Sequence, residues 1–202
     1  AESRPRAVDL MDALASGELS AVSLMQKTYD RIAQENPRIN AICTLVPLEQ
    51  SLEAAQRVDD ARHQGQKLPE LAGLPLAIKD LADTRGVLTT QGSPIYAQHI
   101  PDVDSLFVSR LRAAGGIIIG KTNTPEFGAG SHTFNPLFGV TRNPYDTLKT
   151  AGGSSGGAAA ALASGMIALA DGSDMGGSLR NPEADCSVVG LRPTMGRVPT
   201  LP

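Results

Sequence analysis

Two glycine–serine clusters and one lysine hold the residue types that nucleophilic chemistry needs. The residues are Ser154, Ser155, Ser178 and Lys79. Glycine lets a backbone turn sharply or approach another group, so the clusters at 152–157 and 176–178 should aim backbone N–H groups beside serine hydroxyls. A flexible Gly/Ser linker is the alternative. The intervening segment 158–170 is too apolar for an exposed tether, which argues against the linker.

No histidine motif of a hydrolase or metalloprotease accompanies these serines. The patterns H-E-x-x-H and H-x-x-E-H are absent, and the three histidines lie in unrelated contexts. A serine nucleophile would therefore need another base, and Lys79 is the available candidate. The alternative for Lys79 is an ordinary strand-end lysine in solvent, and for His132 it is a hydrogen bond within its loop.

Hydrophobic periodicity predicts an α/β framework that positions these residues. Helices are expected at 7–16, 21–35, 48–62 and 105–114, and strands at 39–46, 74–79 and 117–119. Ser20 is the expected N-cap of the second helix, and Asn36-Pro37 its expected end. Strand, helix and strand with continuous apolar runs are typical of a parallel βαβ unit.

The second half of the chain mixes apolar and irregular stretches. Segment 158–170 is long enough for a helix and a short buried strand, and 188–191 is strand-like. Segment 123–146 is predicted to be a long loop of the kind that often carries function. We divide the chain into an N-terminal helical segment, 1–65, and a core, 66–202.

Composition narrows the range of partners. The net charge is −3 with no basic patch, which argues against nucleic acid and against an anionic membrane. Cys43 and Cys186 lie far apart and outside any metal-ligand spacing, so we expect two reduced, buried thiols in a cytoplasmic protein. No signal peptide or membrane-spanning run is recognised, and neither metal nor cofactor is expected.

One nucleotide-binding motif is rejected. Residues 115–122 match the P-loop pattern G-x-x-x-x-G-K-[ST], but a helix precedes them and three isoleucines fill the would-be loop. Those isoleucines should bury in a sheet and cannot wrap a phosphate.

Several ordered motifs together resemble the amidase signature family of serine hydrolases. The matching stretches are 73–80, 151–157, 172–182 and 186–197, within a similarity that runs from about Leu10 to the end. The resemblance implies an α/β/α sandwich around a mixed, largely parallel sheet, incomplete in this chain because family members are longer. It also implies amide hydrolysis by a Ser–cis-Ser–Lys triad.

Carried over by position, Lys79 resembles the family's base, Ser154 the bridging serine and Ser178 the nucleophile. The peptide bond before Ser154 should then be cis. The family's oxyanion hole corresponds to the backbone N–H groups of Met175, Gly176, Gly177 and Ser178. Burial would favour the neutral amine of Lys79, whose ordinary pKa is about 10.4.

Supporting roles are expected for the neighbouring residues. Asp174 and Arg180 should form an ion pair that holds the nucleophile turn, Ser155 should bond the glycine loops, and Asp80 should lie near Lys79. The chain departs from the family at Glu183 and Asp185, where small or aromatic residues are usual. Two carboxylates there would fit poorly in a packed turn behind Ser178.

The predicted function is an amidohydrolase that cleaves a small-molecule carboxamide through an acyl-serine. The alternatives are the A subunit of a glutamyl-tRNA amidotransferase and a catalytically silent scaffold domain. We expect the polypeptide 1–202 alone to lack full activity. A homodimer is one possible assembly.

Overall fold

A three-stranded mixed sheet forms the centre of the computed structural model, which describes residues 5–199. Strand β3 (Ile117–Thr122) lies between β1 (Ile42–Leu45) and β2 (Pro75–Lys79). It runs antiparallel to β1 and parallel to β2. Because β1 belongs to the 1–65 segment, that segment shares a sheet with the rest of the chain.

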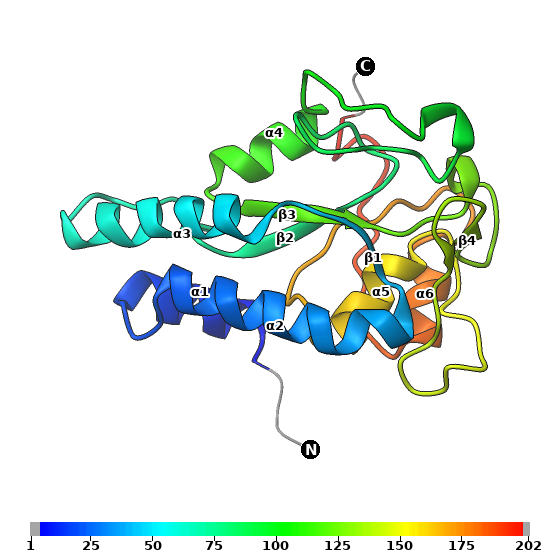
Figure 1. Cartoon of the computed structure of the whole chain (residues 1–202), viewed down its shortest axis with the longest axis horizontal. Coiled ribbons are helices and arrows are strands. Elements are labelled where there is room, and N and C mark those ends of the chain that lie inside the picture. Colours follow the sequence, from blue (N-terminus) through cyan, green and yellow to red (C-terminus); the bar gives the residue numbers. More distant parts are fainter. Residues whose placement is uncertain (1–4, 200–202) are drawn as a thin grey trace.

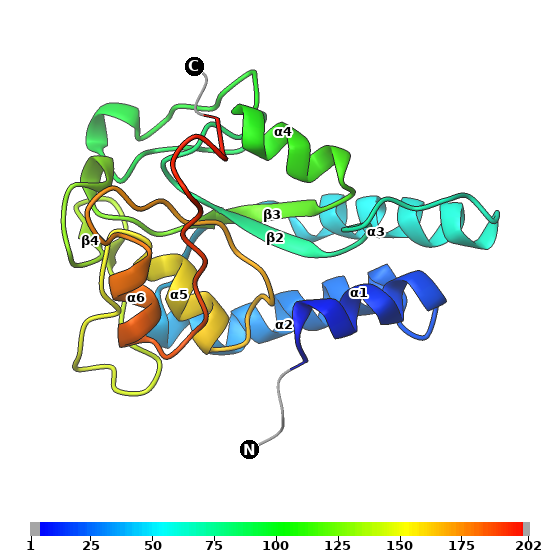
Figure 2. The same ribbon diagram turned by 180° about the vertical axis from the view of Figure 1, so that it is seen from behind.

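Helices cover both faces of the sheet (Figure 1). They are α1 (Ala7–Ser16), α2 (Ala21–Ile39), α3 (Leu48–His63), α4 (Leu106–Ala113), α5 (Gly156–Ala163) and α6 (Arg180–Asp185). The view from behind also places α4 on one side of β2 and β3, and α1, α2 and α5 on the other (Figure 2). No helix within residues 5–199 has the length and apolar character needed to cross a bilayer.

Short elements fill the loops near the carboxyl ends of β2 and β3. They are the 3-10 helices η1 (Pro94–Tyr96) and η2 (Glu126–Gly128), and the hairpin of β4 (Phe134–Asn135) and β5 (Gly139–Val140). The predicted loop at 123–146 therefore contains η2 and this small hairpin.

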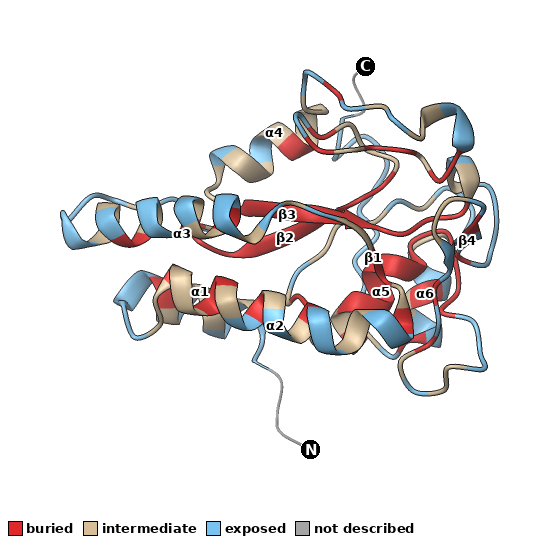
Figure 3. Ribbon diagram, viewed as in Figure 1, coloured by how far each residue is buried: buried red, intermediate tan, exposed pale blue. Residues whose placement is uncertain are grey.

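Alternation along β3 divides the core between the two faces, as expected for side chains that point to opposite sides of a strand. Ile117 and Ile119 join the main apolar cluster with residues of α2 and α5, whereas Ile118 packs with Ile78 of β2 and Val108 of α4. Burial colours mark β2 and β3 as the interior of the molecule (Figure 3). The isoleucines are thus sheet residues, which confirms that 115–122 is not a P-loop.

The start of α2 is capped twice. The hydroxyl of Ser20 accepts a hydrogen bond from the Ser23 N–H at 3.0 Å, which confirms Ser20 as the N-cap. The carboxylate of Asp59, on α3, accepts from the backbone N–H groups of Ala21 and Val22 at 2.9 and 3.1 Å. Asp59 is 4% exposed and joins α3 to the free donors of α2.

The predicted end of α2 at Asn36-Pro37 is wrong, because the helix continues to Ile39. Pro37 removes one backbone donor, but the helix gains the burial of Ile39 and ends at Asn40, a left-handed C-cap with φ of 57°. Asn36 then accepts from the N–H groups of Ala41 and Ile42 at 2.8 and 2.9 Å. These bonds turn the chain directly into β1.

Two strand predictions are also wrong. After α5, only Ala170 reaches the sheet, as a single parallel bridge to Ala77. Residues 188–191 form coil, with Val189 and Leu191 95% and 82% exposed. Their apolar sequence is strand-like, but no neighbouring strand within residues 5–199 pairs with them. The cysteines are both free, with Cys186 buried and Cys43 partly exposed.

Replacing Asp59 by alanine should lower the free energy of unfolding by about 2–4 kcal/mol, because two N–H groups at the start of α2, one buried and one part-buried, lose a charged acceptor. Urea denaturation measures this change. Asp60→Ala is the matched control on the exposed side of the same helix, with an expected effect within about 0.5 kcal/mol. Equal effects of the two substitutions would contradict the capping role.

Candidate active site

The end of β2 places the amine of Lys79 inside the protein among serine hydroxyls. Its Nζ donates to the Oγ atoms of Ser154, Ser155 and Ser173 at 2.7, 2.8 and 2.9 Å. Lys79 is 1% exposed, which excludes the strand-end lysine in solvent. These three hydrogen bonds use all the donors of an ammonium group.

Burial shifts the proton equilibrium of this amine. Removal from water disfavours the charged form and lowers the pKa of Lys79 from 10.5 to about 8, against the opposing charges of Asp171 and Asp174. A pKa of about 8 leaves roughly a tenth of the lysine neutral at pH 7. Lys79 can therefore both accept and return a proton near neutral pH.

The chain around Ser154 and Ser155 packs so closely on its neighbours that only glycine fits at positions 153 and 157. The Gly153–Ser154 peptide bond is cis. A Cβ atom on Gly153 would come within 2.7 Å of the His132 backbone nitrogen, and one on Gly157 within 2.3 Å of the Asn123 nitrogen. The backbone of this loop thus packs directly on the loop after β3. His132 itself hydrogen-bonds Thr150 through Nδ1 at 3.1 Å, the local role expected for it.

Ser178 lines the same small cavity as Ser154. Both Ser154 and Ser178 line this cavity, and the Ser155 N–H donates to the Ser178 carbonyl at 2.9 Å. Among the hydrogen bonds of residues 5–199, none joins the hydroxyls of Ser154 and Ser178. The structure therefore joins Lys79 to Ser154 directly, and brings Ser178 to the same cavity by its backbone.

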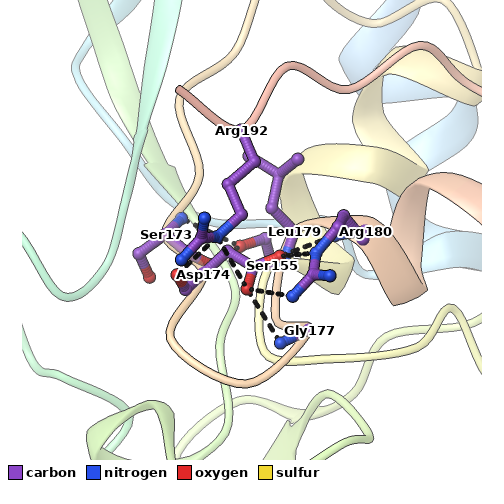
Figure 4. Close-up of polar contacts among 7 residues, drawn as sticks. All are labelled: Ser155, Ser173, Asp174, Gly177, Leu179, Arg180 and Arg192. Atoms are coloured by element: carbon purple, nitrogen blue, oxygen red, sulfur yellow. Dashed lines mark hydrogen bonds and ion pairs between the residues drawn. The ribbon is translucent and has the colours of Figure 1, made fainter. Parts of the chain in front are cut away.

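The carboxylate of Asp174 organises the turn before Ser178 (Figure 4). It accepts from Arg180 Nε and Nη2 at 2.9 and 3.1 Å, and from the Gly177 N–H at 2.8 Å. Arg192, from the coil after α6, approaches the same carboxylate at 3.5 Å. The hydrogen bond from Arg180 holds the pKa of Asp174 well below its usual range, although the Asp174 side chain is only 2% exposed.

This arrangement divides the four predicted oxyanion donors. The Gly177 N–H points to Asp174. The N–H groups of Met175, Gly176 and Ser178 have no hydrogen-bond acceptor among the described residues. Met175 is 97% exposed, so this part of the turn is open to an entering ligand.

Sequence reasoning missed two residues next to Lys79 and misplaced a third. Ser173 supplies the third hydroxyl to the amine, and Asp171 accepts from the Lys79 backbone N–H at 2.8 Å. Asp80, expected near Lys79, instead accepts a hydrogen bond from the Thr90 hydroxyl. Successive strand side chains alternate, so Asp80 follows Lys79 on the other face. The sequence does offer one signal for Asp171, because it is the first charged residue after the apolar segment 158–170.

Lys121, on β3, is a second buried lysine. Lys121 Nζ donates to the Ala82 carbonyl and to the hydroxyls of Thr84 and Thr89 at 2.9 and 3.0 Å. Burial lowers its pKa to about 8, as for Lys79. It holds the loop after β2 in place.

The cavity at the serines has a volume of about 430 Å³. Leu81, Phe127, Met175 and Asn181 supply its larger side chains, and glycine, alanine and serine supply the remainder. A larger cavity of about 650 Å³ lies between α2 and β5, and none of these serines lines it. Within residues 5–199 no group of three or more His, Cys, Asp or Glu is arranged to hold a metal ion.

Glu183 and Asp185 lie on α6, which follows the turn that carries Ser178. One carboxylate oxygen of Glu183 is buried without a hydrogen-bond partner among the described residues, against the backbone of Gly190. Asp185 is exposed, and its Oδ2 borders Gly152 of the serine loop. The poor fit expected of two carboxylates is therefore present at Glu183.

The fold and the motifs define the class of protein: this chain belongs to the amidase family, whose family model, Amidase, matches residues 23–202. The A subunit of glutamyl-tRNA(Gln) amidotransferase from Desulfatibacillum aliphaticivorans is 49% identical over 185 residues, which is 92% of this chain and 38% of that protein. The chain thus spans about two fifths of the length of the curated relatives that it matches.

Solved structures share the fold. One, described as a vestigial protein complex that reveals the evolutionary origins of an s-triazine catabolic enzyme, is 40% identical with a TM-score of 0.91, and covers 98% of this chain and 44% of that chain. The peptide amidase from Stenotrophomonas maltophilia is 33% identical with a TM-score of 0.82, and covers 90% of this chain and 38% of that chain.

Replacing Glu183 by alanine should raise the free energy of unfolding by about 1 kcal/mol, because it removes a buried oxygen that lacks a donor. Thermal and urea unfolding measure the change. Glu53→Ala, at an exposed helical position of α3, is the control and should stay within about 0.5 kcal/mol. A destabilised Glu183→Ala variant would mean that the carboxylate has a stabilising partner in solution.

Proposed function

We propose that this protein is a serine amidohydrolase that cleaves a carboxamide into a carboxylate and ammonia or an amine. The observation that carries the proposal is the buried amine of Lys79, whose side-chain partners are all hydroxyls and whose pKa is about 8. A buried amine without a carboxylate contact is suited to take and return a proton at neutral pH. The membership of the amidase family supports amide chemistry.

In the proposed mechanism, neutral Lys79 takes the proton of Ser154, and Ser154 takes the proton of Ser178. The Ser178 oxygen then forms a bond to the amide carbonyl carbon. Collapse of the tetrahedral intermediate breaks the C–N bond, and the same relay, run in reverse, protonates the leaving nitrogen. Water attacks the acyl-serine in a second cycle. The Ser154–Ser178 hydrogen bond would form in the substrate complex, since catalytic hydrogen bonds often tighten there.

The hydrogen bonds around Ser155 bear on which hydroxyl the lone pair of the Lys79 amine faces. The Ser155 hydroxyl donates to the Ser173 carbonyl at 3.3 Å, so its oxygen can only accept from Lys79. Ser173 also accepts from the ammonium form of Lys79. With Ser155 and Ser173 accepting the two remaining protons, the neutral amine would direct its lone pair to Ser154. Ser155 and Ser173 thus act as positioning residues.

Developing negative charge on the carbonyl oxygen would be stabilised by the backbone of the nucleophile turn. The N–H groups of Met175, Gly176 and Ser178 are the ready donors, and the Gly177 N–H would join them only by leaving Asp174. Loss of one such donor typically slows acylation by about 10²–10³-fold.

The second candidate function is that of an amidotransferase A subunit. Curated relatives with this name, 45–49% identical to the chain, favour it. The chemistry at Ser178 would be the same, but the ammonia would pass to partner subunits. The polypeptide 1–202 alone should lack full activity, but the hydrolase hypothesis predicts that the ammonia it does release from a simple carboxamide requires neither a partner nor ATP. Release that requires partner subunits would instead support the amidotransferase.

Ser178 should react covalently with an alkyl fluorophosphonate, with loss of fluoride, at a rate that follows the neutral fraction of Lys79. Because the pKa of Lys79 is about 8, the rate should rise about tenfold per pH unit below pH 8 and level off above it. Peptide mapping identifies the labelled serine, and rates from pH 6 to 9.5 give the profile.

The control for this profile uses the other buried lysine, whose pKa is also about 8. Lys79→Ala should slow labelling by about 10²–10⁴-fold and abolish the pH dependence, whereas Lys121→Met should keep it. A labelling rate that still rises with pH in Lys79→Ala would contradict Lys79 as the proposed base. Absence of any labelling would favour the catalytically silent scaffold.

A further inference from the structure

The lining of the cavity at Ser178 contains no ionisable side chain. Its larger members are Leu81, Phe127, Met175 and Asn181. The charged groups nearby are used elsewhere: Glu126 accepts from the Ser93 hydroxyl at 2.6 Å, and Asp174 is paired with Arg180. Within residues 5–199, no cation lines the cavity to receive a substrate carboxylate.

Phe127 stands at the edge of this cavity in an unusual backbone conformation. It is a non-glycine residue with φ of 53°, in the left-handed region, and it is 47% exposed. Bulky residues rarely adopt this conformation, and such residues cluster at functional sites. Its ring packs edge-on against Tyr96, with centroids 6.2 Å apart and an interplanar angle of 85°. Phe127, which lines the cavity, is thus braced by the ring of Tyr96.

The next residue keeps the space between the walls open. Gly128 has φ of 67°, and a Cβ atom there would lie 2.7 Å from Leu81 Cδ1 and 3.6 Å from the Ser154 hydroxyl. Any side chain at 128 would enter the space between Leu81 and Ser154. The gap beside the serines is therefore bordered by apolar side chains and remains accessible.

We propose that this cavity accepts an uncharged, apolar acyl group, and that Phe127 is its specificity-determining wall. The inference rests on the proposed function, since it assigns the group that Ser178 would acquire. A methyl or methylene group beside Phe127 would leave water for an apolar surface, whereas a carboxylate there would lose hydration without gaining a partner. A difference of about tenfold or more is expected between such groups.

The test compares two fluorophosphonates, a pentyl probe and the same probe with a carboxylate in place of the terminal methyl group. The measured quantity is the second-order rate constant for labelling of Ser178 at pH 8.5. The wild-type protein should react with the pentyl probe about tenfold faster or more. Phe127→Ala should reduce this ratio to about threefold or less by slowing the pentyl probe alone, and Phe127→Leu should retain most of it.

Phe134→Ala is the matched control, because Phe134 is 57% exposed on β4 and does not line the cavity. It should leave the ratio unchanged. Equal rates for the two probes in the wild-type protein would overturn the inference, as would a Phe127→Ala variant that slows both probes alike. The wild-type comparison needs no variant, so it holds even if Phe127→Ala fails to fold. No labelling of Ser178 by either probe would instead reject the proposed function, and the inference with it.

Discussion

The enclosure of the Lys79 amine is the constraint on which the rest of the site depends. A buried ammonium group is costly unless its donors are satisfied, and here three hydroxyls satisfy them without fixing the charge. A carboxylate in direct contact would hold the proton on the amine. The nearby acids are turned away: Asp171 faces the Lys79 backbone N–H, and Asp174 faces arginine. The fold thus keeps negative charge close but without contact.

The loops that meet at the amine come from three distant parts of the chain. β2 supplies Lys79, the cluster before α5 supplies Ser154, and the turn before α6 supplies Ser178. Glycine makes this meeting possible, because backbone atoms of the second loop lie where side chains would clash with the loop after β3. Asp174 holds the third loop through backbone and guanidinium donors. The geometry of the site is therefore a property of backbone packing rather than of any single side chain.

Much of this arrangement follows from the sequence. Period-two burial in β3, the N-cap at Ser20 and the Asp174–Arg180 pair each have local signals that hydrophobic alternation, capping chemistry or charge spacing can detect. The remaining features depend on contacts between distant segments. Asp171 and Ser173 become neighbours of Lys79 only after β2 and the later loop meet, and no periodicity encodes that contact. The continuation of α2 through Pro37 was missed because burial of Ile39 outweighs the loss of one backbone donor.

The bond from the Lys79 backbone to Asp171 also affects the outer edge of β2. Along the side of β2 that faces away from β3, Pro75 has no N–H group, Ala77 forms its bridge with Ala170, and Lys79 donates to Asp171. An exposed row of free donors is what lets one sheet recruit a strand from another molecule. In the part of the chain described, this edge is closed at each alternate position. The contacts that hold Lys79 thereby also cover this edge of the sheet.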